Sequence, residues 1–218
     1  MKSILVFLIG MGFISCHQIK DTAIMNKKIV IAHRGASGYL PEHTMEAKAM
    51  AHAMNCDFIE QDVVLSKDDV AIVIHDIYLD DVTDVATKFS NRKRADNRYY
   101  VVDFTFAELQ TLKVFERFNH ATGAQLYLNR FPKGAGTFKL HSFEQELQLI
   151  QGLNKSTQKN IGIYPEIKEP EFHKKEGKNL TKIVLKLLAD YGYHTKKDNC
   201  ILQCFDAKEL ERIRIEFK

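Results

Sequence analysis

The sequence predicts an α/β fold built on a parallel sheet. Strand-like runs alternate with helical runs along the 218 residues, and polar side chains gather where the strands end. Such alternation is typical of parallel sheets, whose connections are helices. The length suits one domain with a sizeable core. The net charge of +3 is small and no basic tract alternates with aromatic residues, so a nucleic-acid surface is not expected.

The N-terminus has the composition of an export signal. Lys2 precedes the apolar run 4–14, which is too short to span a bilayer, because a spanning helix needs about 20 residues. Cys16 then resembles the acylated cysteine of a bacterial lipoprotein, although Phe13 stands where leucine is more usual. We expect a lipoprotein-type signal at 1–15, a tether at 16–27 and a periplasmic or outer-membrane-anchored protein. The alternative is a buried strand or helix.

The first half of the domain, which we expect over 28–218, contains three predicted strands. The β-branched run 29–32 precedes His33, and 44–54 has helical spacing with Thr44 as a candidate N-cap. The next two strands are predicted at 58–65 and 70–74.

The second half repeats the alternation. We expect helices at 143–153, 180–191 and 207–215, and the fourth and fifth strands at 161–167 and 201–205. Gly192 ends the most amphipathic helix. The remaining cysteines number three, so a complete set of disulfides is excluded.

Residues 77–142 interrupt this rhythm. A connection of that length inside a compact α/β unit is usually a functional insertion. It contains a short predicted helix near 106–115 and the charged run 92–98, which we interpret as a solvated surface with anion binding as the alternative.

Polar residues mark the ends of the predicted strands. Side chains two apart on a strand share a face, so Glu60 lies beside Asp62, and Glu166 beside Lys168. His33 and His75 end the first and third predicted strands. In parallel α/β folds this end of the sheet is where sites are built.

Each of these residues alone is better interpreted as structural, but together they indicate chemistry. Three carboxylates on one edge repel one another unless something compensates. A hard divalent cation does so, and oxygen ligands suit Ca²⁺ or Mg²⁺. Arg34 and Lys168 suit a phosphate group. Two histidines suit a general acid and a general base.

Several quoted stretches carry a family resemblance. HRGASGYLPEHT, FIEQDVVLSKDDVAIVIHD and IYPEIK resemble the glycerophosphodiester phosphodiesterases. RYYVVDFTFAELQTLK, HSFEQELQLIQGLN and ILQCFDAKEL resemble the bacterial periplasmic members. The resemblance implies a TIM-type (β/α)₈ barrel, of which about the first five units are present. It also implies that 77–142, after the third strand, caps the active site.

The resemblance also implies roles for single residues. His33 and His75 correspond to the catalytic acid/base pair, and Glu60, Asp62 and Glu166 to the metal ligands. Arg34, Lys168 and Glu42 correspond to phosphate-binding or further active-site residues. His43 is interpreted as local structure, with a site role as the alternative. Phe205 and Gln203 either line the pocket or, for Phe205, belong to the core. Gly35 and Gly38 are expected to let the backbone turn near the substrate.

The expected activity is hydrolysis of glycerophosphodiesters to glycerol 3-phosphate and an alcohol, with Ca²⁺ as the favoured metal and Mg²⁺ as the alternative. One alternative is a phosphodiesterase acting on intact lipid head groups, and another is a non-catalytic, surface-anchored lipoprotein. The sequence leaves open the preferred alcohol, the nucleophile, which histidine is the acid, and the number of subunits. Small-molecule substrates are expected, with membrane contact only through a lipid on Cys16.

The C-terminal end gives a further expectation. A complete barrel usually takes about 250 residues, and only five strands are predicted here. We therefore expect a fragment of a longer enzyme, poorly soluble or inactive when expressed alone. The alternative is that a second chain supplies the other strands.

Overall fold

The computed structural model describes residues 28–216. The expected signal, the tether and Cys16 lie outside these residues. None of the helices in the described part of the chain combines the length and apolar character needed to cross a membrane.

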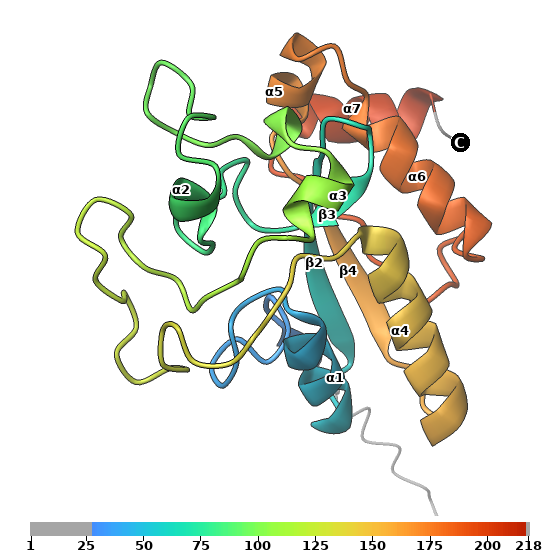
Figure 1. Cartoon of the computed structure of the whole chain (residues 1–218). Coiled ribbons are helices and arrows are strands. Elements are labelled where there is room, and N and C mark those ends of the chain that lie inside the picture. Colours follow the sequence, from blue (N-terminus) through green and yellow to red (C-terminus); the bar gives the residue numbers. More distant parts are fainter. Residues whose placement is uncertain (1–27, 217–218) are drawn as a thin grey trace, which may run out of the picture.

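A four-stranded sheet forms the centre of the fold. Its strands are β1 (Ile31–Ala32), β2 (Phe58–Leu65), β3 (Ala71–Val73) and β4 (Gly162–Ile167). β2 pairs in parallel with β1 on one side and with β4 on the other. β2 and β4 run side by side through the molecule (Figure 1).

The direction of β3 corrects the sequence prediction, because β3 runs antiparallel to β2. Only residues 66–70 join the two strands, and a parallel crossover needs a dozen or more. The backbone N–H of Ser66 donates to the carbonyl of Val70 at 3.0 Å, and Asp69 has a φ of 61°. This tight turn sends the chain straight back along β2.

The predicted strand at 201–205 is present only as an extended segment. Isolated parallel bridges join Cys200 to Ile163 and Gln203 to Glu166. The N–H of Ile201 donates to the Ile163 carbonyl at 3.0 Å, and the N–H of Ile167 to the Gln203 carbonyl at 2.9 Å. The segment therefore lies beside β4 in the expected direction.

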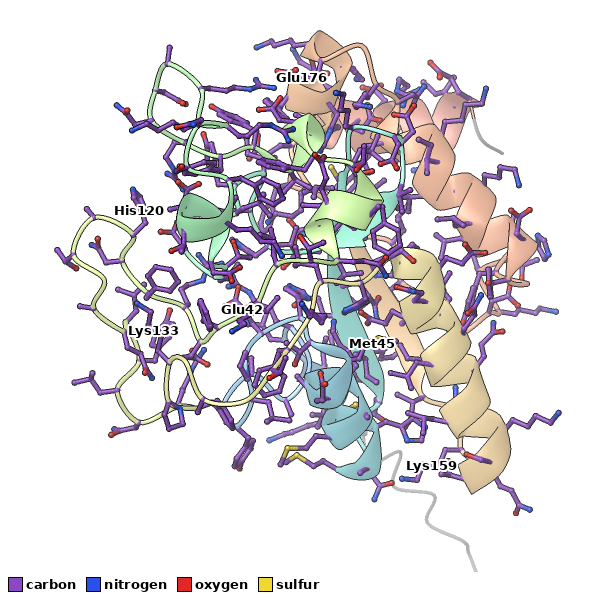
Figure 2. The ribbon with its side chains drawn as sticks, in the orientation of Figure 1. Glu42, Met45, His120, Lys133, Lys159 and Glu176 are labelled. Carbon is purple, nitrogen blue, oxygen red and sulfur yellow. The ribbon has the colours of Figure 1, made fainter. Side chains whose placement is uncertain are left out.

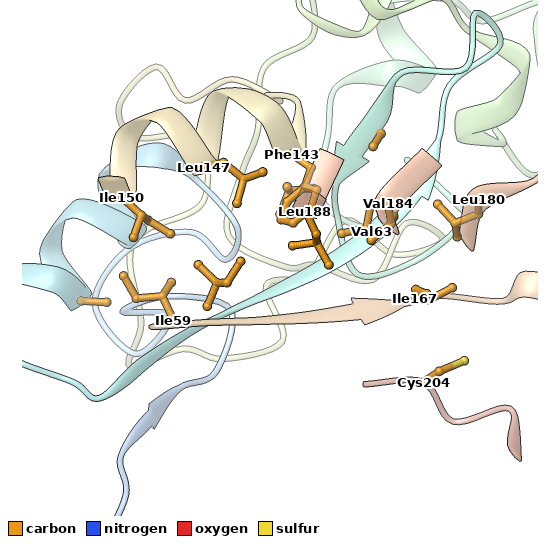
Figure 3. Packing of buried hydrophobic residues seen from close by; sticks show 14 of the residues in the cluster. Ile59, Val63, Phe143, Leu147, Ile150, Ile167, Leu180, Val184, Leu188 and Cys204 are labelled. Carbon is orange, nitrogen blue, oxygen red and sulfur yellow. The ribbon is translucent and has the colours of Figure 1, made fainter. Parts of the chain in front are cut away.

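Three helices cover one face of the sheet: α1 (Met45–Ala53), α4 (Phe143–Thr157) and α6 (Leu180–Asp190). Thr44 caps α1 as predicted, since its side chain accepts from the N–H of Ala47. The largest core cluster joins the helices to alternate residues of β2 and β4 (Figure 3); among them are Ile59, Val63, Ile167, Leu147 and Val184.

Residues 77–142, which we call the long connection, extend away from α4 and α6 (Figure 1). They include α2 (Val85–Lys88), the 3₁₀ helix η1 (Val101–Asp103) and α3 (Phe106–Leu109). The helix predicted to reach residue 115 thus stops at Leu109. A second core cluster packs the long connection against Val64 and Ile72 of the sheet.

Two helices follow β4 and the 200–203 segment. They are α5 (Pro170–Lys175), which the sequence did not predict, and α7 (Ala207–Glu216). Within residues 28–216 the sheet is open. Ile29 and Val30, just before β1, are 61% and 56% exposed.

Candidate active site

The face of the sheet opposite α4 and α6 carries the polar residues. Ile59 and Val63 of β2 belong to the helix-covered core, so the alternation along the strand directs Glu60 and Asp62 to the other face. The register places Asp62 directly beside Glu166 of β4. The three predicted metal ligands therefore come together.

Asp62 lies at the centre of this group. Its Oδ2 accepts from His43 Nε2 at 2.7 Å, and the guanidinium Nε of Arg34 lies 3.8 Å away. Lys168 Nζ is 3.7 Å from Oδ1, which is buried and has no hydrogen-bond partner among residues 28–216. Burial raises the pKa of Asp62, but the His43 hydrogen bond and the Lys168 charge outweigh it and bring the pKa below its usual range.

The two glutamates behave differently from Asp62. Burial, reinforced by the negative charge of Asp62, raises the pKa of both Glu60 and Glu166. Glu60 accepts the backbone N–H of Arg34 at 2.6 Å, and Glu166 pairs with Lys168 at 2.7 Å. Adjacent buried carboxylates that resist ionisation are a natural host for a cation.

The residues fit a hard cation in their chemistry. Ligand atoms of His43, Glu60 and Asp62 all lie within 4.8 Å of one another in the described part of the chain. The third member of this group is His43, whereas the sequence analysis expected Glu166 as the third ligand. Both ring nitrogens of His43 are engaged, however, because Lys48 Nζ donates to Nδ1 at 3.2 Å. The candidate oxygen ligands are thus Asp62 Oδ1, which accepts no hydrogen bond from residues 28–216, and the carboxylates of Glu60 and Glu166.

Arg34 and Glu42 form the second part of the site. Both carboxylate oxygens of Glu42 accept from Nη1 of Arg34, at 3.1 and 3.0 Å. Burial raises the pKa of Glu42, but Arg117 and Arg34 outweigh it and bring the pKa to about 2. Arg34 has a φ of 59°, an uncommon left-handed conformation for a residue other than glycine.

The two predicted catalytic histidines lie on either side of the carboxylates. His33 is 68% exposed and its Nε2 is 3.8 Å from Glu60. His75 Nδ1 is 2.7 Å from Asp76, and Lys168 Nζ is 3.5 Å from Nε2. A carboxylate only accepts and an ammonium only donates, so His75 carries its proton on Nδ1 and turns its Nε2 lone pair toward Lys168.

Two residues that the sequence analysis did not identify complete this side. Asp76 holds His75, and Arg117 of the long connection contacts both Asp76 and Glu42. Glu42 accordingly lies where the loop after β1 faces the long connection (Figure 2). The position of Asp76 directly after His75 was a usable signal. Arg117 had none, because nothing in its neighbourhood distinguishes it from other arginines.

A buried network behind the site was also missed. Lys48 Nζ lies 3.1 Å from Glu146 and also donates to the Glu60 carbonyl, and His141 Nε2 is 2.7 Å from Glu146. Lys48 is fully buried. Nothing in the sequence indicated this burial, because lysine is rarely fully buried unless it is paired, and Glu146 is far away in the chain.

A pocket of about 330 Å³ opens at the end of β4, and its lining includes Glu166, Lys168 and Phe205. Phe205 is 85% exposed, so its interpretation as core is wrong. Gly35 has a φ of 79°, and a Cβ there would lie 3.0 Å from the Ala47 backbone in α1. Gly38 has no positive φ, and a Cβ there would meet nothing within 4 Å. The expectation for Gly38 is therefore not supported by the geometry.

Solved structures share this fold. A putative glycerophosphoryl diester phosphodiesterase from Silicibacter pomeroyi has a TM-score of 0.64 at 23% identity, over 85% of this chain and 60% of its own. An Oleispira antarctica phosphodiesterase in complex with the product sn-glycerol-3-phosphate has a TM-score of 0.58 at 20% identity, over 87% of this chain and 62% of its own. At these identities the likeness concerns the fold.

Curated relatives are closer in sequence. A glycerophosphodiester phosphodiesterase from Haemophilus influenzae is 49% identical over 99% of this chain and 61% of its own length. One from Treponema pallidum is 46% identical over 88% of this chain and 54% of its own. The chain thus spans a little over half the length of these relatives. The sequence model of the glycerophosphoryl diester phosphodiesterase family matches residues 33–218. The chain therefore belongs to the glycerophosphoryl diester phosphodiesterase family.

Proposed function

We propose that this chain carries the active site of an enzyme that hydrolyses glycerophosphodiesters to glycerol 3-phosphate and an alcohol. The observation that carries the proposal is the meeting of Glu60, Asp62 and Glu166 beside His75, with a buried Asp62 oxygen that has no hydrogen-bond partner among residues 28–216. Family membership and the names of the relatives support it.

Each part of the site has a role in this proposal. Arg34 and Lys168 bind the phosphate oxygens. His33 and His75 transfer protons, one activating the nucleophile and the other protonating the leaving alcohol. The Nε2 lone pair of His75 next to Lys168 places a proton acceptor beside the phosphate clamp.

Glu60, Asp62 and Glu166 would hold the metal, which we propose to be Ca²⁺, with Mg²⁺ as the alternative. Bound there, a hard cation polarises the phosphoryl oxygens and neutralises charge that develops on them. Oxygen-only ligands favour these two ions.

We further propose that the protein is exported and held at a membrane by a lipid on Cys16. The short apolar run 4–14 and the following cysteine support this location.

A second candidate substrate is the head group of an intact lipid. The long connection exposes Leu128, which is 84% accessible, next to Leu126 and Tyr127 at 50% and 44%. Such an exposed group suits contact with a lipid surface.

The test is turnover of glycerophosphocholine by the full-length protein, with and without a chelator. We expect activity that the chelator abolishes and Ca²⁺ restores. Glu60→Gln and Asp62→Asn should remove Ca²⁺-dependent turnover, and His33→Ala and His75→Ala should each lower kcat by roughly 10²–10⁴-fold. A parallel assay with phosphatidylcholine vesicles separates the two substrate classes.

Glu46→Gln is the matched control for the carboxylates, because Glu46 is exposed on α1. Turnover that persists unchanged in chelator would rule out the metal. A loss of tenfold or less in either histidine variant would remove that histidine from the mechanism.

A further inference from the structure

Arg117 forms a second connection between two parts of the site, which Asp62 and Lys168 also join by longer contacts. Its Nη2 and Nε donate to the two oxygens of Glu42 at 2.6 and 3.1 Å, and its Nη1 donates to Asp76 Oδ2 at 2.7 Å. The side chain is 12% exposed. A single guanidinium from the long connection therefore bridges a carboxylate after β1 and a carboxylate after β3.

Each bridged carboxylate holds a residue of the proposed machinery. Glu42 also binds the Arg34 guanidinium, and the other oxygen of Asp76 accepts from His75 Nδ1 at 2.7 Å. The order of contacts is Arg34, Glu42, Arg117, Asp76, His75. Arg34 and His75 are thus linked by hydrogen bonds through Arg117.

We propose that Arg117 is a positioning residue that holds His75 in one tautomer and orientation through Asp76. This inference rests on the proposed function and deepens it. A carboxylate that accepts from one ring nitrogen keeps the proton there and leaves the other nitrogen free for chemistry. Arg117 supplies the second contact that prevents Asp76 from rotating away.

The geometry also favours Arg over Lys at this position. The planar guanidinium offers donors in fixed directions and reaches two carboxylates at once, whereas an ammonium is a point charge. The interactions of Arg117 raise its pKa above the usual range, because Glu42 and Asp76 outweigh the effect of burial. Arg117 therefore stays charged at every pH at which the kinetics are measured.

The first experiment compares steady-state kinetics of the full-length protein and its variants on glycerophosphocholine. Arg117→Ala should lower kcat by about 10- to 100-fold, the scale seen when supporting partners of site residues are removed. KM should change little, because Arg34 keeps its own bond to Glu42. Arg117→Lys should lose less kcat than Arg117→Ala. Added guanidinium ion should restore part of the kcat of Arg117→Ala.

A double-mutant cycle tests the route. The double variant combines Arg117→Ala with Asp76→Asn. If Arg117 acts through Asp76, the fold-loss of kcat in the double variant will be smaller than the product of the fold-losses in the two single variants. A multiplicative loss would overturn the route through Asp76.

Arg94 provides the matched control. It lies in the same long connection and also bridges two carboxylates, Asp103 at 2.8 Å and Glu176 at 2.7 Å. Glu176 lies by α5, well away from Glu42 (Figure 2). Arg94→Ala should leave kcat unchanged.

A second readout does not require turnover. Side-chain ¹⁵N NMR of the metal-free chain should show His75 with its proton on Nδ1, and Arg117→Ala should show exchange between both tautomers. If the full-length wild-type protein turns nothing over, the proposed function fails while this measurement still decides the role of Arg117. A single unchanged tautomer in Arg117→Ala would overturn the inference. Arg117→Gln replaces Arg117→Ala if the latter does not fold.

Discussion

Two fully buried basic side chains, Lys48 and His173, adapt to burial in different ways. Lys48 has an ion pair with Glu146 at 3.1 Å, whereas neither ring nitrogen of His173 has a hydrogen-bond partner within the described part of the chain. Burial, helped by the charge of Lys178, lowers the pKa of His173 to about 4. His173 is therefore neutral in the folded protein at neutral pH.

His173 should make stability depend on pH. The unfolded chain binds its proton near the ordinary histidine value of 6.5, and the folded chain only near 4. The contribution of neutral, buried His173 to the free energy of unfolding is fully present above pH 6.5. It is lost as the pH falls toward 4. At about 1.4 kcal/mol per pKa unit, the full loss is about 3–4 kcal/mol.

The measurement is the free energy of unfolding by urea at pH 7.5 and at pH 4.5. The difference between wild type and His173→Leu should change by most of that amount between the two pH values. His194→Leu, at an exposed histidine, is the control. Equal pH dependence in wild type and His173→Leu would refute the assignment.

Neighbours in sequence explain which side chains could be predicted. Glu60 and Asp62 share a strand face by the period-two rule, so their meeting followed from spacing alone. Lys48 and Arg117 could not be found in this way. Glu146 lies 98 residues from Lys48, and Asp76 and Glu42 lie 41 and 75 residues from Arg117. Their roles depend on tertiary packing rather than local pattern.

At the scale of elements, helices were predicted better than strand directions. The helix after Thr44 has its expected cap, and α6 ends one residue before the predicted end. β3 was assigned the wrong direction because periodicity reports burial and not orientation. The link at 66–70 is too short for a parallel crossover, so its length already indicated the antiparallel direction. The end of β3 still reaches Asp62, since the N–H of Ile74 donates to its carbonyl at 3.0 Å.

The start of β4 depends on one glycine. A Cβ at Gly162 would lie 2.4 Å from the Phe58 ring and 2.8 Å from the carbonyl oxygen of Asn199. Gly162→Ala should therefore push β4 away from β2 and lower the free energy of unfolding by about 1–3 kcal/mol, the usual cost of overpacking.

Gly152 provides the same substitution in a different setting. It lies within α4, and nothing would come within 4 Å of its Cβ. Gly152→Ala should raise stability by up to about 1 kcal/mol, because alanine favours helices. Thermal unfolding of the two variants checks both directions, and a Gly162→Ala variant as stable as wild type would contradict the packing argument.

At the scale of the whole molecule, two core clusters meet at the sheet. One joins the sheet to α1, α4 and α6, and the other joins it to the long connection. Because β2 contributes to both, the site residues on β2 are fixed from two sides. The family resemblance in the sequence predicted the fold type. The expectation that the chain alone is poorly soluble or inactive stays a prediction.

Metal binding should stabilise the whole fold if the site holds a cation. A ligand at 100 times its Kd adds about 2.7 kcal/mol, which corresponds to a rise in Tm of roughly 5–10 °C for a chain of this size. Differential scanning calorimetry with Ca²⁺ and with chelator measures this rise. Glu60→Gln should abolish it and Glu46→Gln should keep it; an equal rise in both variants would place the cation elsewhere.

The burial of Lys48 also has a consequence for covalent modification. Its amine is enclosed by Glu146, His43 and the Glu60 carbonyl. An acetyl group, or any amine-reactive label, reaches this nitrogen only when the chain is unfolded or locally open. Acetylation would also remove the charge that faces Glu146. A molecule that is modified on Lys48 was therefore modified before it folded, or during a local opening. The modification thus reports that the chain was unfolded or open when it reacted.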